Sequence, residues 1–389
     1  MNVSSSHKRF WESPRDYIGE LPTTGKGVGV MVLDQGFDTS HPDLKGRVIE
    51  VATSPQDVFD SDPVGHGTLV LGIVGADGSS SNGEIKGVAP DATLIAARVN
   101  VNEKTDWKTS SASVATAIDW AVKNKDEFNI KVINCSFVHP MVERLDPATR
   151  QVAGLFDPLG YSLQMAFDAG ITVVAGVGNF GDKQPIMTPA GNPNVIAVGA
   201  LDTNGTPEDT SDDTVAHFSS RGLSSEGKPK PDILAPGVNI MSTNASGSSF
   251  EQRNTLNTKF ATVALRGPMK SVKIIAQKQI QKGWLPASVM GLPDQELRHE
   301  VLRCYEVKGS RTNEEGVVTH LAQDGSSEAS PIVAGVVANM LEANPSLTPD
   351  EVREILYSTT RPVEGDPLAT GRGAIDAQRA VAEALRRRQ

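Results

Sequence analysis

The chain has 389 residues, a formal net charge of −10 at pH 7 and a hydrophobic content of 38%. These values are typical of an ordinary globular protein, and the negative charge argues against a general nucleic-acid binder. No apolar run is long enough to span a membrane, and the N-terminal residues lack the apolar core of a secretion signal. The only cysteines are Cys135 and Cys304, so the sequence contains no disulfide framework and we expect a cytoplasmic protein.

The first informative segment is the apolar run at residues 28–33. Such a run is typical of a strand buried on both faces of a parallel sheet. Asp34 follows it directly, at the strand end where ligand-binding and catalytic groups collect in open α/β sheets. Taken alone, the pattern fits a capping or turn residue equally well.

A histidine between two glycines comes next. His66 lies between Gly65 and Gly67, and the small, apolar residues that follow predict a buried helix to residue 76. Glycine on both sides lets other backbone or a substrate approach the imidazole closely. A lone histidine is usually structural, but this one stands between an aspartate at a strand end and a serine at a helix start. Five of the other histidines lack such a setting: His41, His139, His217, His299 and His320.

The middle of the chain alternates between predicted strands and a predicted helix. Residues 87–98 read as a turn and a buried strand, residues 111–124 as a helix, and residues 131–137 and 171–179 as two further strands. This alternation favours a parallel, doubly wound sheet. Asn179, after Gly178, is either a turn former or an amide donor to an oxyanion.

Residues 324–343 predict a helix of small and apolar residues that begins at Ser326 and Ser327. Each serine by itself could be only the N-cap of this helix. A hydroxyl in the first turn is also held rigidly beside unpaired backbone N–H groups, which suits a serine that attacks a carbonyl.

Five ordered motifs carry a family resemblance. Asp34 in VLDQGFDTSHPDL, His66 in GHGT, Asn179 in AGVGN, PDILAPG at 231–237 and GSSEASPIVAG at 325–335 resemble the subtilisin-like serine proteases, or subtilases. The order Asp, His, Ser is also that of this family. The resemblance covers roughly residues 10–245 and 324–385. It implies a three-layer α/β/α fold with a mainly parallel, doubly wound sheet. We expect a single catalytic domain over residues 1–389, interrupted by an insertion at 246–323.

The resemblance also implies a serine endopeptidase with an acyl-enzyme on Ser327. His66 would be the general base, Asp34 would orient it, and the Asn179 amide with the Ser327 N–H would hold the oxyanion. The expected partner is a polypeptide substrate, and no cofactor is required. Substrate-binding strands are expected near 103–108 and 134–138. The residues expected to border the pocket are Ser136, Phe137, Val138 and Gly178.

Several positions depart from the family pattern. Glu328 stands where Met is typical, and it would repel an oxyanion if it pointed inward. Val138 stands where Gly is common, which should narrow the pocket. Residues 139–160 predict an extra surface loop or a short helix. The segment at 76–87 offers Asp77, Asn82 and Glu84, but its length differs from the calcium-binding version, so calcium is possible but not indicated.

These departures leave other functions open. The alternative to a peptidase is a catalytically weak homologue that binds a peptide or a partner. A third possibility is acyl transfer to an amine instead of water.

The insertion at 246–323 is the largest departure. VKIIAQKQIQK and residues 293–307 predict two helices, the second with Asp294 as a cap, and residues 315–320 predict a strand. The basic first helix is either a solvated face or part of a lid or exosite. After the insertion, Thr348 to Glu351 form a capping-box pattern that opens the next helix.

Overall fold

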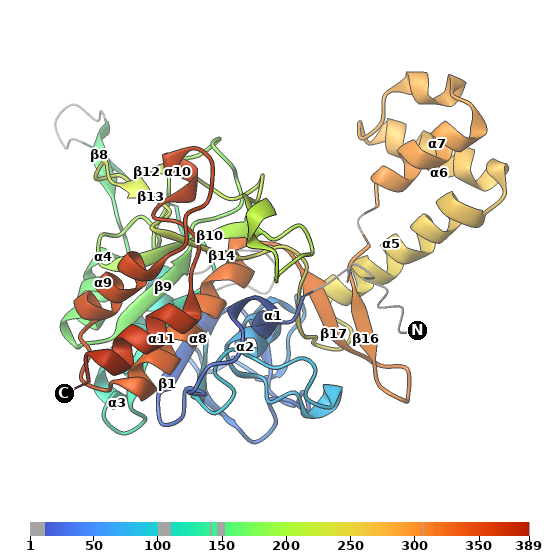
Figure 1. Cartoon of the computed structure of the whole chain (residues 1–389). Coiled ribbons are helices and arrows are strands. Elements are labelled where there is room, and N and C mark those ends of the chain that lie inside the picture. The colour runs from blue at the N-terminus through green and yellow to red at the C-terminus, as the bar shows by residue number, and fades with distance from the viewer. Residues whose placement is uncertain (1–11, 100–109, 141, 146–151, 306, 389) are drawn as a thin grey trace.

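The computed structural model describes residues 12–99, 110–140, 142–145, 152–305 and 307–388 (Figure 1). A mainly parallel sheet forms the centre. Its strands follow the order β11 (Thr214–Val215), β10 (Val195–Asp202), β9 (Thr172–Gly176), β6 (Ile130–Cys135), β1 (Gly29–Asp34), β5 (Thr93–Arg98) and β3 (Val48–Val51), and β14 (Ile233–Pro236) also pairs with β10. Only the β10–β11 pair is antiparallel among these described strands.

Strand β1 shows why the apolar runs have no alternation. Val30 and Val32 point into one hydrophobic core, whereas Met31 and Leu33 point into another on the opposite face of the sheet. The first core packs against α2 (His66–Gly75), α8 (Ser326–Ala343), α9 (Pro349–Thr359) and α11 (Ala377–Arg386), and the second against α3 (Ser111–Asn124) and α4 (Gly160–Asp168). The expected three-layer α/β/α fold is therefore confirmed.

Short elements complete the body. They are α1 (Pro14–Ile18), α10 (Pro367–Thr370), η1 (Ser79–Ser81), η2 (Thr210–Asp212), the paired strands β2 (Phe37–Asp38) with β4 (Asp60–Ser61), and β12 (Gly222–Leu223) with β13 (Pro229–Lys230). The capping box at Thr348 and Glu351 is present at the start of α9. Within the described part of the chain, no helix is long and apolar enough to cross a membrane.

The segment after β6 differs from its prediction. In place of a loop or a short helix, it forms an antiparallel pair, β7 (Val142–Leu145) with β8 (Val152–Phe156). Backbone N–H and C=O groups need partners, and an excursion away from the main sheet obtains them when its two arms pair with each other.

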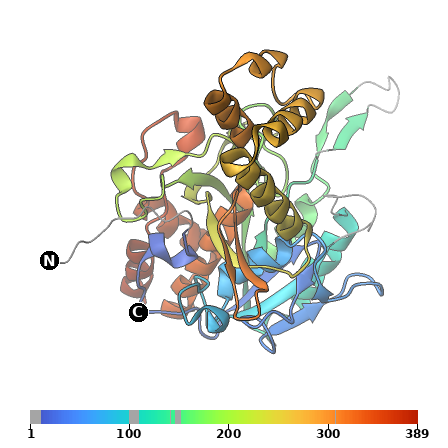
Figure 2. The same cartoon turned by 90° about the vertical axis from the view of Figure 1, so that its right-hand side faces the viewer.

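The inserted residues form two parts with different attachments. Helices α5 (Ser249–Arg266), α6 (Met269–Gln281) and α7 (Asp294–Arg303), with η3 (Ala287–Gly291), surround a core of their own and project from the body in both views (Figures 1 and 2). That core contains Ala261, Ala264, Val272, Ile275, Ala276, Leu285, Val289, Leu297, Val301 and Tyr305. By contrast, β16 (Ser310–Thr312) and β17 (Val318–Gln323) form one sheet with β15 (Ile240–Thr243) of the body.

Both predicted helices of the insertion are present, and the predicted strand begins at Val318. Asp294 is not the cap of its helix. Pro293 occupies the N-cap position and Asp294 is the first helical residue, without a side-chain cap hydrogen bond.

Candidate active site

The carboxyl ends of three adjacent strands, β1, β6 and β9, meet the N-terminus of α8 at one cavity of about 380 Å³. Parallel strands end at the same edge of a sheet, so residues far apart in the chain become neighbours there. All eight predicted site residues line this cavity: Asp34, His66, Ser136, Phe137, Val138, Gly178, Asn179 and Ser327. Four further residues line the cavity: Ser326, which the sequence singled out beside Ser327, and Gln35, Gly176 and Phe180, to which it assigned no role.

Asp34 and His66 form a buried pair. The Asp34 Oδ2 atom lies 2.7 Å from Nδ1 of His66, and Asp34 Oδ1 accepts a hydrogen bond from the Gln35 N–H at 2.8 Å. Both side chains are nearly inaccessible to solvent. Because Nδ1 faces the carboxylate, the imidazole is held in one orientation at the first residue of α2.

The glycines beside His66 make room for the protein's own chain. A Cβ at Gly67 would collide with the Gly36 carbonyl oxygen and lie 2.9 Å from Cβ of Asp34. A Cβ at Gly65, where φ is 93°, would lie 2.7 Å from Oγ of Ser248. The sequence allowed either the protein's own chain or a substrate to come close to these glycines. The structure shows that other segments of the protein do so.

The charge around His66 favours its protonated form. Burial by itself would lower the pKa of His66, but the charge and hydrogen bond of Asp34, with smaller contributions from Glu328 and Asp62, raise it to about 9. The imidazolium that would form during acyl transfer is therefore stabilised in place.

The two serines at the start of α8 have different surroundings. Gly325, which has no side chain, is the N-cap of α8, so neither serine has the capping role that each could have had. Ser326 is buried, and its Oγ accepts a hydrogen bond from the Gly178 N–H at 2.9 Å. Ser327 is half-buried at the cavity, and its Oγ donates to the Ser136 carbonyl at 3.1 Å. Of the two serines, Ser327 therefore has the more accessible side chain at the helix start.

Asn179 is fixed by the same turn. Its Oδ1 accepts a hydrogen bond from the Ser326 N–H at 2.9 Å, so the opposite end of the amide, Nδ2, is left as a donor. Nδ2 lies 3.0 Å from the point that a Cβ on Gly325 would occupy. The amide donor is thus positioned over the start of α8, beside Ser327.

The predicted pocket residues have separate surroundings. Ser136 Oγ donates to the Ser327 carbonyl at 2.9 Å, so this hydroxyl joins β6 to α8. Val138 and Phe180 approach Gly178 from the cavity side, within 3.2 and 3.3 Å of a Cβ built on it. A side chain at position 178 would therefore meet both residues. The other expected substrate-binding strand, 103–108, lies outside the described residues.

Phe250, the second residue of α5, was not identified from the sequence. Its ring packs edge-on against the His66 ring, with the centroids 6.2 Å apart, and the side chain is buried. The backbone of Ser249 donates to the Pro63 carbonyl at 2.8 Å, which ties the start of α5 to the segment before His66. The helical part of the insertion therefore begins directly against the candidate catalytic histidine.

Two of the acidic residues that the loop at 76–87 offers have partners within the protein. Asp77 Oδ1 accepts from the Ser79 N–H, and Glu84 forms an ion pair with Arg311 of β16. Among the described residues, no group of three or more His, Cys, Asp or Glu side chains could hold a metal ion. Asp77 and Glu84 thus each contact a partner within the protein.

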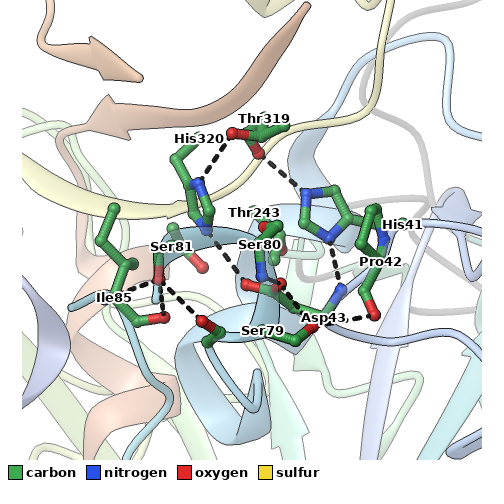
Figure 3. Close-up of polar contacts among 12 residues, drawn as sticks. His41, Pro42, Asp43, Ser79, Ser80, Ser81, Ile85, Thr243, Thr319 and His320 are labelled. Carbon is green, nitrogen blue, oxygen red and sulfur yellow. Dashed lines mark hydrogen bonds and ion pairs between the residues drawn. The ribbon is translucent and has the colours of Figure 1, made fainter. Parts of the chain in front are cut away.

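The same loop encloses a buried polar network (Figure 3). Asp43 accepts hydrogen bonds from the Ser80 N–H at 2.6 Å and from Nε2 of His320 at 3.1 Å. His41 contacts the Thr319 carbonyl through Nε2 at 2.9 Å and accepts from the Asp43 N–H at 3.1 Å. Two histidines without a sequence signal therefore connect β17 to the loops of the body.

Comparisons with known proteins agree with this geometry. The model of the Subtilase family matches residues 25–377. Serine protease AprX of Bacillus subtilis (strain 168) is 34% identical over 365 residues, which is 92% of this chain and 67% of AprX. The Major intracellular serine protease of the same strain is 32% identical over 235 residues, covering 56% of this chain and 60% of that protein.

A solved structure supports the fold alone. Fervidolysin from Fervidobacterium pennivorans matches with a TM-score of 0.62 and 22% identity, over 94% of this chain and 45% of that chain. The family match and the AprX similarity extend over most of the described elements. The chain therefore belongs to the subtilase family of serine proteases.

Proposed function

We propose that this chain is a serine endopeptidase that hydrolyses polypeptides through an acyl-enzyme on Ser327. The observation that carries the proposal is the buried Asp34–His66 hydrogen bond of 2.7 Å beside the cavity that Ser327 also lines. An isolated serine hydroxyl is a weak nucleophile at neutral pH, and an adjacent base oriented by a third group activates it.

The proposed reaction uses the side chains of Ser327, His66 and Asn179 and the backbone of Ser327. Ser327 Oγ attacks the scissile carbonyl while Nε2 of His66 takes its proton, which then passes to the leaving amine. Water, activated by the same imidazole, releases the acyl group. The Asn179 Nδ2–H and the Ser327 N–H would hold the oxyanion. One such donor contributes about 2.7–4 kcal/mol to transition-state stabilisation, a magnitude that comes from subtilisin, the family's namesake.

The substrate side follows from the pocket. Ser136, Phe137, Val138 and Gly178 would border the residue before the cleaved bond, and Val138 with Phe180 would favour a small side chain there. We infer a cytoplasmic location, which the similarity to a relative named as intracellular supports. Activity should not require calcium, because Asp77 and Glu84 are directed to other partners.

The helical part of the insertion, α5–α7, would act as a lid or exosite for polypeptide substrates. Its support is the contact between Phe250 and His66 at the base of α5. The weak-homologue alternative lacks comparable support, because the similar proteins are named as proteases.

Labelling with a fluorophosphonate probe tests the catalytic assignment. Wild type should be labelled at Ser327, identified by mass spectrometry of the labelled peptide, and Ser327→Ala should not be labelled. Ser326→Ala is the matched control, because it removes the neighbouring hydroxyl and should retain labelling at Ser327. Labelling of Ser327→Ala, or a wild type that stays unlabelled, would contradict the assignment.

A further inference from the structure

Glu328 is a buried acidic residue directly after the proposed nucleophile. Its side chain is 2% exposed, and Oε2 has no hydrogen-bond partner among the described residues. A carboxylate in the first turn of a helix gains from the helix dipole, but burying one without a partner is costly. A group kept in such surroundings is positioned to act on its neighbours through its charge.

The carboxyl group of Glu328 lies on the catalytic side of the helix start. A Cβ built on Gly325 would collide with Glu328 Oε2 and would lie 3.0 Å from Nδ2 of Asn179. The carboxyl group therefore shares the space over Gly325 with the proposed oxyanion donor. The structure thus shows a buried carboxyl group over Gly325, next to the cavity and not among the residues that line it.

The charged groups around Glu328 come from three elements. They are His66 of α2, Asp324 of the turn before α8, and Lys308 of the segment that leads into β16. His66 lines the same cavity as Asn179, near whose amide the Glu328 carboxyl group lies. Lys308 also forms an ion pair with Asp324. Burial raises the pKa of Glu328 to about 7, and the nearby His66 opposes that rise. Around His66 itself the charged groups are Asp34, Asp62 and Glu328.

This arrangement couples Glu328 to the proposed general base. His66 must be neutral to accept the proton of Ser327, and a nearby carboxylate stabilises the imidazolium instead. Water screens the interaction little, because both side chains are buried. The same negative charge beside Asn179 would also oppose an oxyanion held there.

We propose that Glu328 is a positioning residue that keeps His66 protonated up to a higher pH and so moves the working range of the enzyme toward alkaline conditions. The proposal rests on the proposed function, in which His66 is the base. The direction of this shift in pH follows from the charge of Glu328. Removing the carboxylate destabilises the imidazolium, so His66 becomes neutral, and therefore active, at a lower pH.

The test is the pH dependence of kcat/KM on an uncharged peptide for wild type and Glu328→Gln. The acid limb should move to lower pH by about one unit in Glu328→Gln, since a single opposite charge close by shifts a pKa by roughly that amount or more. The plateau at high pH should rise, because the charge beside the oxyanion is gone. Glu315→Gln is the matched control, because Glu315 is an exposed carboxylate in the turn between β16 and β17. The acid limb of its pH profile should not move. An unmoved acid limb in folded Glu328→Gln would overturn the proposal.

A second measurement does not depend on turnover. The titration of His66 is followed by NMR in a Ser327→Ala background, with and without Glu328→Gln. The His66 midpoint should fall in the double variant, and an equal midpoint would refute the coupling even if the enzyme is a peptidase. Fluorophosphonate labelling of wild type reports separately on the proposed function. If Glu328→Gln does not fold by circular dichroism, Glu328→Met removes the same charge with an apolar side chain of similar size and decides the question.

Discussion

The buried pair of His320 and Asp43 should be a major anchor between β17 and the body. Both side chains are fully inaccessible, and His320→Leu would leave Oδ2 of Asp43 without its 3.1 Å partner. Burial would raise the pKa of Asp43, but the hydrogen bonds from His320 and Ser80 outweigh it and hold the pKa well below the usual carboxyl range. In His320→Leu the carboxyl group of Asp43 would stay buried with one donor fewer, and burial would oppose its ionisation more strongly than in the wild type.

We expect His320→Leu to lower the free energy of unfolding by about 3 kcal/mol. This value lies between the typical loss for one unpaired buried acceptor and that for a broken buried ion pair. With an unfolding entropy of about 2.1 cal/mol/K per residue, a chain of this length loses roughly 4 °C in Tm for that free energy. The difference in unfolding free energy between wild type and His320→Leu should become smaller as the pH falls below about 4. Asp43 has a lowered pKa in the folded state, so its contribution is present above the unfolded pKa and is lost on acidification.

The assay is guanidinium unfolding at pH 7 in a Ser327→Ala background, which prevents self-digestion. A double-mutant cycle with Asp43→Asn isolates the pair, and the two changes should be strongly non-additive. His299→Leu is the control, because His299 is exposed on α7 and its loss should change stability by no more than about 0.5 kcal/mol. A loss below about 1 kcal/mol in His320→Leu, or additive effects in the cycle, would refute the reasoning.

Three further predictions concern the cavity and the insertion. Asn179→Ala should lower kcat about 100- to 1000-fold with little change in KM, and a parallel change in KM would argue against an oxyanion donor. Val138→Gly should raise the preference for Phe over Ala before the cleaved bond by about tenfold in kcat/KM, whereas an unchanged ratio would place Val138 outside the pocket. Replacing residues 256–306 with a short Gly/Ser bridge should impair hydrolysis of folded proteins more than that of short peptides. The bridge can be short because Asn254 is already hydrogen-bonded to the backbone of Lys308, and Phe250 is retained. Equal losses on both substrates, with a cooperative unfolding transition that shows a folded body, would assign the helices a purely structural role.

Local patterns were sufficient for the elements that carry the candidate site. The apolar run before Asp34 predicted a strand buried on both faces, and its residues 30–33 alternate between the two cores. The predicted helix at 111–124 matches α3, since helical periodicity and its N-cap serine are local properties. The carboxyl ends of the strands then indicated where Asp34, Ser136 and Asn179 would meet, because parallel strands end at one edge of a sheet.

Only the tertiary structure decided which groups surround those residues. The contacts between Phe250 and His66 and between Asp43 and His320 join segments that are far apart in the chain, and a single side chain leaves no periodic pattern. The pairing of β7 with β8 and the orientation of Glu328 were equally undetermined, because each depends on the partners available after folding. Local periodicity thus determined the elements and the edge where the site lies, whereas the charge and packing around the catalytic groups arose from contacts that exist only in the folded chain.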